Sequence, residues 1–135
     1  MRRSRRVVRE RAAMVHPDLS GPAYMMLTFI VGHGASRASD IAEVFQLDKG
    51  AVSRAVHSLM ELGLLEKECD PDDRRAMILN ATPEATQRIR EISQQRLARL
   101  GSLLEEWTVE DIEEFVASFG RYNDLLEASL EPARH

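Results

Sequence analysis

The stretch that decides the fold spans residues 48 to 59 and reads Asp48-Lys49-Gly50-Ala51-Val52-Ser53-Arg54-Ala55-Val56-His57-Ser58-Leu59. Three of its apolar residues, Val52, Val56 and Leu59, recur at i, i+4 and i+7, which is the spacing of one buried helix face. Asp48 is a suitable N-cap, because its carboxylate can accept a hydrogen bond from a free N–H of the first turn. Gly63 suits a left-handed C-cap. The stretch therefore predicts an amphipathic helix that begins after Asp48 and ends before Gly63.

The opposite face of this helix carries small or cationic side chains: Lys49, Gly50, Ser53, Arg54 and His57. A shorter helix, Asp40 to Phe45, precedes it, and only Gln46-Leu47 joins the two. Two helices so closely joined, the second with a small and cationic outer face, predict a helix-turn-helix that places its second helix in a DNA major groove.

Two strand-length segments follow, from Leu64 to Cys69 and from Ala76 to Asn80. Between them lies Asp70-Pro71-Asp72-Asp73-Arg74-Arg75, which has the composition of a turn. A hairpin with two arginines at its tip, directly after a recognition helix, is predicted to be a wing. We expect Arg74 and Arg75 to enter the minor groove, where negative potential is focused.

At these residues the chain resembles the MarR family of bacterial winged-helix regulators. The resemblance rests on Asp73-Arg74-Arg75 with Thr82 at the family's spacing, on Ser53-Arg54, on Leu62-Gly63-Leu64 and on Thr82-Pro83-Glu84. It extends from the first helix to Leu126. One departure is Ala81, where the family usually has leucine, and we expect looser packing under the wing there.

The expected fold is mainly α with a small β-hairpin wing (α+β), in a single domain covering residues 1–135. Residues 20–82 would form the winged helix-turn-helix lobe, and residues 1–19 and 83–130 the helices of a two-fold dimerisation domain. After the wing, Thr82 is predicted to cap a long helix that runs to Trp107. Thr108-Val109-Glu110-Asp111, a variant capping box, opens a last helix with an apolar stripe from Ile112 to Leu126. The lobe cannot cover the apolar faces of these two helices, so they need another subunit. Predicted interface residues are Val8, Leu104, Trp107, Phe115, Phe119, Tyr122 and Leu126.

Composition limits the possible classes of protein. The chain has 135 residues, 44% of them hydrophobic and 30% charged, as in an ordinary soluble domain. No apolar run approaches the roughly 18 residues of a membrane span, and no signal-like apolar segment follows the basic start. A single cysteine excludes an internal disulfide and fits a reducing compartment. We therefore expect a cytoplasmic protein without a membrane partner.

The net charge of −4 hides a strong segregation of charge. Six arginines lie between Arg2 and Arg11 against one acid, whereas nine acids and one arginine lie between Glu105 and Glu131. A DNA reader needs only a local basic footprint, so the negative total does not exclude DNA binding. The arginines of the first helix have two open interpretations, contact with DNA phosphates or a solvated helix end.

The predicted DNA contacts divide by role. Lys49 and Arg54 can donate to guanine or to a phosphate, Gly50 and Ala51 allow close approach, and Ser53 and His57 complete the face. Arg37 and Ser39 stand at the start of the first helix of the pair, where they hold a phosphate or serve as ordinary caps. Asp73 is predicted to hold an arginine side chain of the wing in position. A two-fold dimer then implies a pseudo-palindromic double-stranded DNA operator with half-sites about 10 bp apart.

The family resemblance also implies a ligand cleft. The apolar segment from Ala23 to Val31 is predicted to be a buried helix. In the resembling family this segment backs a site for small aromatic acids, which suggests a small aromatic or anionic ligand at Tyr24, Met25 and Phe29. Plain core is the alternative for all three residues.

Enzyme chemistry finds no support in the sequence. The chain lacks a glycine-rich phosphate loop and a nucleophile motif, and its four histidines are scattered. We expect no catalytic residue, no metal and no cofactor. Cys69 is either a redox-sensitive thiol beside the wing or a structurally idle residue.

Taken together, the helix-turn-helix, the wing and the family resemblance predict a DNA-binding repressor released by a ligand. The alternative is a winged-helix dimer that acts as an interaction or architectural module without a specific operator.

Overall fold

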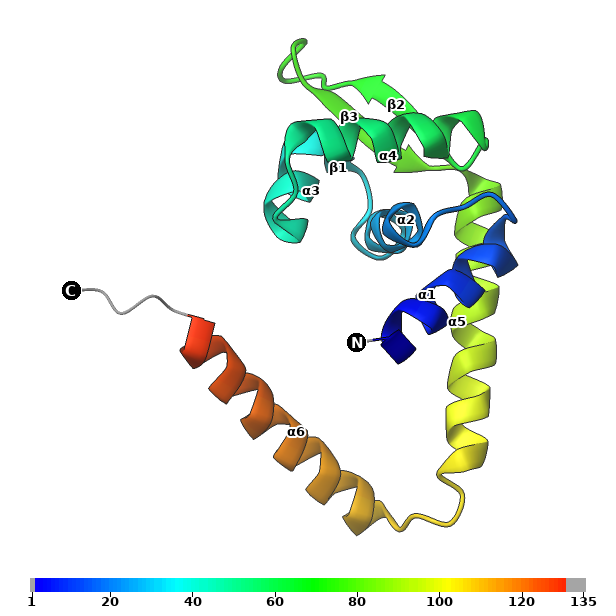
Figure 1. Cartoon of the computed structure of the whole chain (residues 1–135), viewed down its shortest axis with the longest axis vertical. Coiled ribbons are helices and arrows are strands. Elements are labelled where there is room, and N and C mark those ends of the chain that lie inside the picture. Colours follow the sequence, from blue (N-terminus) through cyan, green and yellow to red (C-terminus); the bar gives the residue numbers. More distant parts are fainter. Residues whose placement is uncertain (1, 131–135) are drawn as a thin grey trace, which may run out of the picture. The chain divides into compact units, whose positions relative to one another are not determined.

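The computed structural model describes residues 2–130 and divides into two compact units, Met1–Gln95 and Arg96–His135. Six helices and three short strands make up the described part (Figure 1). The first unit contains α1 (Arg2–Val15), α2 (Gly21–His33), α3 (Ala38–Phe45), α4 (Lys49–Glu61) and all three strands. Helix α5 (Pro83–Leu103) passes from the first unit into the second, which also contains α6 (Val109–Leu130).

The helix ends form where their capping residues predict. The Ser20 hydroxyl accepts a hydrogen bond from the Ala23 N–H at 3.3 Å at the start of α2. The Asp48 carboxylate accepts one from the Ala51 N–H at 2.8 Å at the start of α4. Beyond α4, Gly63 has φ +68°, the left-handed conformation that ends a helix and redirects the chain. The helix-turn-helix segment is confirmed, with Gln46 (φ +51°) turning the chain between α3 and α4.

The sheet has three antiparallel strands in the order β1-β3-β2: β1 (Ser36–Arg37), β3 (Met77–Ala81) and β2 (Leu65–Cys69). The predicted hairpin is confirmed as β2 and β3, with Leu65 opposite Ala81 and Cys69 opposite Met77. The sequence did not reveal β1, which pairs Ser36 with Leu79 and Arg37 with Ile78. Two residues are too few to show an alternating pattern, so the segment reads as the loop before α3.

The core of the first unit forms around α2. Met26, Leu27 and Ile30 are buried against apolar residues that include Ile41 of α3, Leu59 of α4 and Leu79 of β3. In Figure 1 α2 is seen nearly end-on, with α4 and the sheet on one side of it and α1 on the other. The predicted all-round burial of α2 is only partly confirmed, because Met25 is exposed.

The first helix is attached to this core. Ala12 and Val15 of α1 are buried, and the carbonyl of Val15 accepts a hydrogen bond from Arg88 Nη1 of α5 at 2.6 Å. A cation at a helix C-terminus satisfies a free carbonyl and interacts favourably with the helix dipole. Arg88 also bonds Glu84 Oε1 at 2.5 Å, so its guanidinium is held from both sides.

The second unit shows a well-formed helix start. The Thr108 hydroxyl accepts from the Asp111 N–H at 3.1 Å, and the Asp111 carboxylate accepts from the Thr108 N–H at 2.9 Å. This reciprocal pair is the predicted capping box, and it lowers the pKa of Asp111 below its ordinary value. Helix α5 ends at Leu103 rather than at Trp107 as predicted. Among residues 2–130, no helix combines the length and the apolar character that crossing a bilayer requires.

Candidate nucleic-acid interface

The outward face of α4 presents the residues predicted to read DNA. Val52 and Leu59 are buried beneath the helix, so the helical period turns Lys49, Ser53 and Arg54 to the exposed side. His57 is also exposed, and its Nε2 lies 3.2 Å from Glu61 Oε1 one turn later. The structure therefore brings the predicted cationic and small side chains together on one surface.

Gly50, predicted to let α4 approach DNA closely, also leaves space for a neighbouring side chain. A Cβ atom added to Gly50 would lie 3.0 Å from Asp48 Oδ1 and 3.2 Å from Arg54 Nη1. The guanidinium of Arg54 therefore reaches back toward the first turn of α4, into space that a larger residue would occupy. Gly50 and Arg54 are neighbours at i and i+4 on the helix surface, and the glycine leaves the space that the guanidinium approaches.

The wing turn is held by hydrogen bonds from backbone N–H groups to a carbonyl and to an aspartate side chain. The N–H of Asp70 donates to the carbonyl of Ala76 at 3.0 Å, which closes the loop at its base. At the tip, the N–H of Arg75 donates to Asp73 Oδ1 at 3.0 Å. Arg74 and Arg75 are exposed, as a minor-groove contact requires.

The predicted partner of Asp73 needs correction. The sequence suggested that its carboxylate holds an arginine side chain, but the structure shows it bonded to a backbone N–H, that of Arg75. The reason is local: an aspartate side chain reaches the N–H two residues later, which forms an Asx turn. Asp73 thus shapes the turn that carries Arg74 and Arg75.

Asp70 has a role that the sequence did not indicate. It is 2% exposed, its Oδ1 accepts from the N–H of Asp72 at 2.9 Å, and its Oδ2 forms an ion pair with the guanidinium of Arg37. The hydrogen bond from Asp72 is the largest cause that lowers the pKa of Asp70; burial opposes it, and Arg37 lowers the pKa further. Arg37, predicted to hold a phosphate, is therefore directed at the base of the wing, although its side chain remains 45% exposed.

A groove of about 450 Å³ runs between α3, α4 and the sheet. Its lining is largely apolar, from residues such as Val52 and Leu79, and Lys49 and Lys67 supply its cations. Ser39 and Ser53, both predicted to contact DNA, also line it.

Cys69 lies at the end of β2 and is exposed.

The three residues predicted to line a ligand pocket do not share one environment. Tyr24 is 7% exposed and belongs to the core, whereas its neighbour Met25 is 44% exposed. Phe29 stacks on His33 with ring centroids 4.0 Å apart and meets Phe45 edge-on at 5.6 Å. The core alternative therefore describes Tyr24, whereas Met25 and Phe29, four residues apart, share another face of α2.

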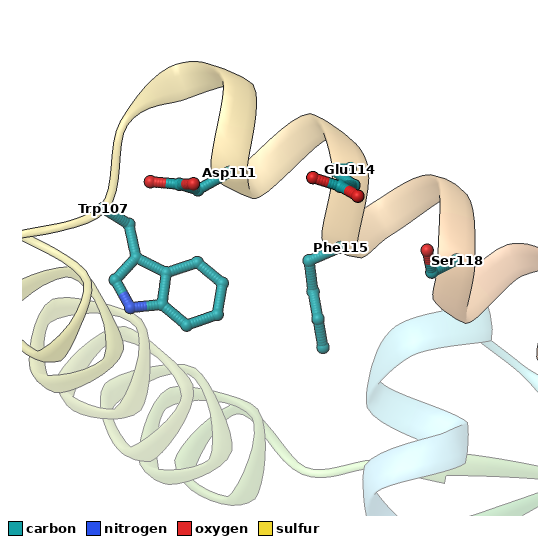
Figure 2. A pocket seen from close by; sticks show the side chains of 5 residues that line it. All are labelled: Trp107, Asp111, Glu114, Phe115 and Ser118. Atoms are coloured by element: carbon teal, nitrogen blue, oxygen red, sulfur yellow. The ribbon is translucent and has the colours of Figure 1, made fainter.

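The second unit exposes an aromatic row along α6. The ring of Phe115 lies 5.9 Å from both Trp107 and Phe119, and Phe119 lies 6.5 Å from Tyr122. Figure 2 shows the indole of Trp107 and the ring of Phe115 on one side of the chain, in a hollow of about 540 Å³ also lined by Asp111, Glu114 and Ser118. Leu126 is exposed, whereas Val8 and Leu104 are half-buried.

A metal centre is not formed by the described side chains. Within residues 2–130, no group of three or more His, Cys, Asp or Glu residues is placed to hold a metal ion. The features that stand out are the exposed α4 face and the arginine-tipped hairpin in the first unit, and the exposed aromatic row in the second.

Comparison with known proteins agrees with this arrangement. The family model described as "MarR family" matches residues 18–76. The HTH-type transcriptional regulator YxaD of Bacillus subtilis is 29% identical over 106 residues, which are 78% of this chain and 74% of that protein. A MarR-like transcriptional regulator of Thermotoga maritima is 27% identical with a TM-score of 0.72, covering 82% of this chain and 79% of that one.

A protein solved in complex with DNA has the same fold. Streptococcus pneumoniae FabT, in complex with DNA, has a TM-score of 0.73 at 18% identity, covering 82% of this chain and 78% of that one. At this identity the likeness concerns the fold alone. The matched helix-turn-helix segment, the sequence relatives and the shared fold make the chain similar to the MarR family of winged helix-turn-helix transcriptional regulators.

Proposed function

We propose that this regulator binds a specific double-stranded DNA operator as a homodimer and acts as a repressor that a small ligand releases. The observation that carries the proposal is the exposed α4 face, small and cationic, beside a hairpin tipped by Arg74 and Arg75. FabT, which shares the fold, has been solved with DNA bound. A chromosomal target also fits the cytoplasmic location predicted from the sequence.

Base reading falls to α4. Lys49 and Arg54 are exposed cations that can donate to guanine O6 and N7 in the major groove. Gly50 keeps the first turn free of side-chain bulk, and the exposed His57 stands near the other end of the helix. With Arg54 folded toward the first turn, we place its base contact near the N-terminal half of α4.

The wing supplies contacts of a second kind. Arg74 and Arg75 are exposed on a turn that two aspartates shape, and an arginine in a narrow minor groove gains from the focused negative potential there. These contacts favour A·T-rich flanks without reading a base pattern in detail. Two lobes related by a two-fold axis would then occupy half-sites about 10 bp apart.

The dimer would form through the exposed apolar face of the second unit. Four aromatic residues are more than 40% exposed: Trp107, which precedes α6, and Phe115, Phe119 and Tyr122, which follow one another along it. A continuous aromatic surface of this kind marks an interaction site in soluble proteins. A second copy of the same chain is the proposed occupant, because a two-fold arrangement lets the same row cover itself.

Release by a ligand is the regulatory part of the proposal. A small aromatic or anionic compound that binds one spacing of the two lobes better than the other would compete with the operator through a shared equilibrium. The exposed Met25 and the Phe29–His33 stack give α2 adaptable and aromatic surface for such a compound. Calorimetry of the pure protein with aromatic carboxylates tests this part: absence of both binding heat and any change in operator affinity contradicts it.

Operator reading is tested by titrating the protein onto its own upstream DNA and onto random DNA at two salt concentrations. A sequence reader keeps a large preference for its operator, whereas a non-specific binder loses most affinity as salt rises. We expect Arg54→Ala to cost about 1–3 kcal/mol at one base position. Arg90→Ala, which removes an exposed arginine of α5, is the matched control and should bind like the unmodified protein.

The same titration distinguishes a sequence-specific regulator from the alternative, an interaction or architectural module without a specific operator. Equal binding to operator and random DNA at both salt concentrations, with Arg54→Ala and Arg90→Ala behaving alike, would establish an architectural role without a specific operator.

A further inference from the structure

One buried carboxylate joins the wing loop to the rest of the lobe. Asp70, at the end of β2, uses Oδ1 to accept the N–H of Asp72 and Oδ2 to pair with the guanidinium of Arg37. Its own N–H donates to the carbonyl of Ala76, so the loop is closed at the same residue. Asp70 is 2% exposed. A buried carboxylate destabilises the folded state unless hydrogen-bond donors or an opposite charge surround it.

Arg37 lies in β1, the edge strand on the opposite side of β3 from β2. It ends β1 and immediately precedes α3, the first helix of the helix-turn-helix. Strand β1 pairs with β3 and not with β2: Arg37 lies opposite Ile78, and Ile78 lies opposite Glu68. The guanidinium therefore crosses the central strand to reach the residue that follows β2. A single side chain links the start of α3 to the base of the wing loop.

The wing arginines lie between the residues that this link holds. The loop runs from Asp70 to Ala76, and both ends are joined by the Asp70–Ala76 hydrogen bond. Within it, Asp72 is bonded to the Asp70 carboxylate, and Arg75 to the Asp73 carboxylate. The direction in which Arg74 and Arg75 leave the sheet thus depends on where Asp70 is held.

We propose that Arg37 and Asp70 are positioning residues that fix the wing relative to the reading helices, so that Arg74 and Arg75 meet the minor groove when α4 occupies the major groove. The proposal rests on the proposed operator binding and adds residues that need not touch DNA. A buried ion pair contributes little net stability, but its strict geometry suits it to fixing the relation of two elements. Loss of the link leaves α4 folded and the wing free to take several directions.

The experiment uses the full-length protein and two operators with the same core, one with A·T-rich and one with G·C-rich flanks. Arg37→Gln removes the guanidinium, and Asp70→Asn removes the charge but keeps an acceptor for the Asp72 N–H. We expect each variant to lose about tenfold in affinity for the A·T-flanked operator, a factor typical of one charge-assisted contact, with little change on the other. The double variant should lose no more than either single variant, because both changes break one link.

Three comparisons make the result specific. Arg75→Ala should reproduce the loss of flank preference, and Glu68→Gln, which removes a charge from β2 but leaves the partners of Asp70 in place, should not. Amide hydrogen exchange, measured without DNA, should quicken at Asp72, Arg75 and Ala76 in both link variants while α4 stays protected.

The outcomes separate the two proposals. If the unmodified protein binds both operators no better than random DNA, operator binding itself fails, while the exchange measurement still reports on the link. Unchanged exchange in the wing overturns the positioning role. So does unchanged flank preference, or additive losses in the double variant, in a protein that otherwise reads its operator.

Discussion

The contribution of the Asp70 carboxylate to the stability of the folded state depends on the groups around it. Water is replaced there by the N–H of Asp72 and the guanidinium of Arg37, and together these lower its pKa although burial acts in the opposite direction. A carboxylate with a lowered pKa stabilises the folded state in its ionised form. That contribution is complete above the pKa of the unfolded chain and is lost as the pH falls through the folded pKa.

The pH dependence of unfolding should therefore reveal Asp70. We expect Asp70→Asn to lower the free energy of unfolding at pH 7 and at pH 5, and the difference from the unmodified protein to shrink below about pH 4. Urea unfolding at fixed protein concentration measures it at each pH. Glu68→Gln is the matched control, since it removes a carboxylate from the same strand and preserves the bonds of Asp70. A difference that stays constant down to pH 3 would show that the charge of Asp70 contributes nothing.

Individual residues differ in how far the sequence could predict them. Lys49 and Arg54 were placed correctly on the exposed face, because the helical period and the buried Val52 and Leu59 fix which side faces out. Asp70 and Asp73 could not be told apart, since both stand in the same acidic turn. Their difference arises from Arg37, which is more than 30 residues away in the chain and reaches Asp70 only in the folded sheet.

Among the elements, α5 begins at a residue that joins two parts of the first unit. The Thr82 hydroxyl accepts from the N–H of Ala85 at 3.2 Å and donates to the carbonyl of Gly63 at 3.1 Å. The N–H of Thr82 donates to the carbonyl of Leu64 at 3.2 Å. The start of α5 is thus bonded to the chain just after α4, the helix that faces the proposed DNA.

Removal of the Thr82 hydroxyl tests this junction. Thr82→Ala should lower the free energy of unfolding by about 1–2 kcal/mol, because a cap and the hydrogen bond to Gly63 are lost together. Thr82→Ser keeps both bonds and should cost much less. Chemical denaturation followed by circular dichroism compares the two variants. Equal losses would mean that the methyl group, and not the hydroxyl, carries the effect.

Elements with long periodic patterns were predicted well, and short or irregular ones were not. The stripes of α4 and α6 and the caps Asp48, Thr82 and Thr108 gave their helices the right starts. Strand β1 was missed because its two residues are fixed by pairing with β3, which is a tertiary effect. The end of α5 was placed too late because Leu104 continues the apolar spacing although the helix has already ended at Leu103.

At the scale of the whole molecule, the two units differ in how their apolar residues are covered. The first unit buries its core between α1, α2, α4 and the sheet. The second unit leaves the large apolar residues of α6 exposed, with Phe115, Phe119 and Tyr122 each more than 50% accessible. An aromatic surface of this extent on a single chain favours association, and a row related to itself by a two-fold axis gives a closed dimer.

Dimer formation and operator binding should fail together when this row is interrupted by a charge. We expect Phe119→Glu to convert the dimer into monomers in analytical ultracentrifugation, because a desolvated carboxylate without a partner opposes association. Operator affinity should fall by more than about tenfold. In a dimer, binding of one lobe brings the second lobe close to the other half-site, and a monomer lacks this increase in effective concentration. Isolated lobes would still keep the fold of α4 and the wing, as circular dichroism would show.

The control places the same charge on the other side of the same helix. Ala117 lies between Glu113 and Arg121 at spacings of four residues, away from the aromatic row, so Ala117→Glu changes net charge and helix composition without crossing that row. It should remain dimeric and bind its operator normally. If both variants stay dimeric, α6 is not the dimer contact. A monomeric Phe119→Glu that binds the operator with full affinity would instead show that one lobe suffices for recognition and that the two-fold operator is unnecessary.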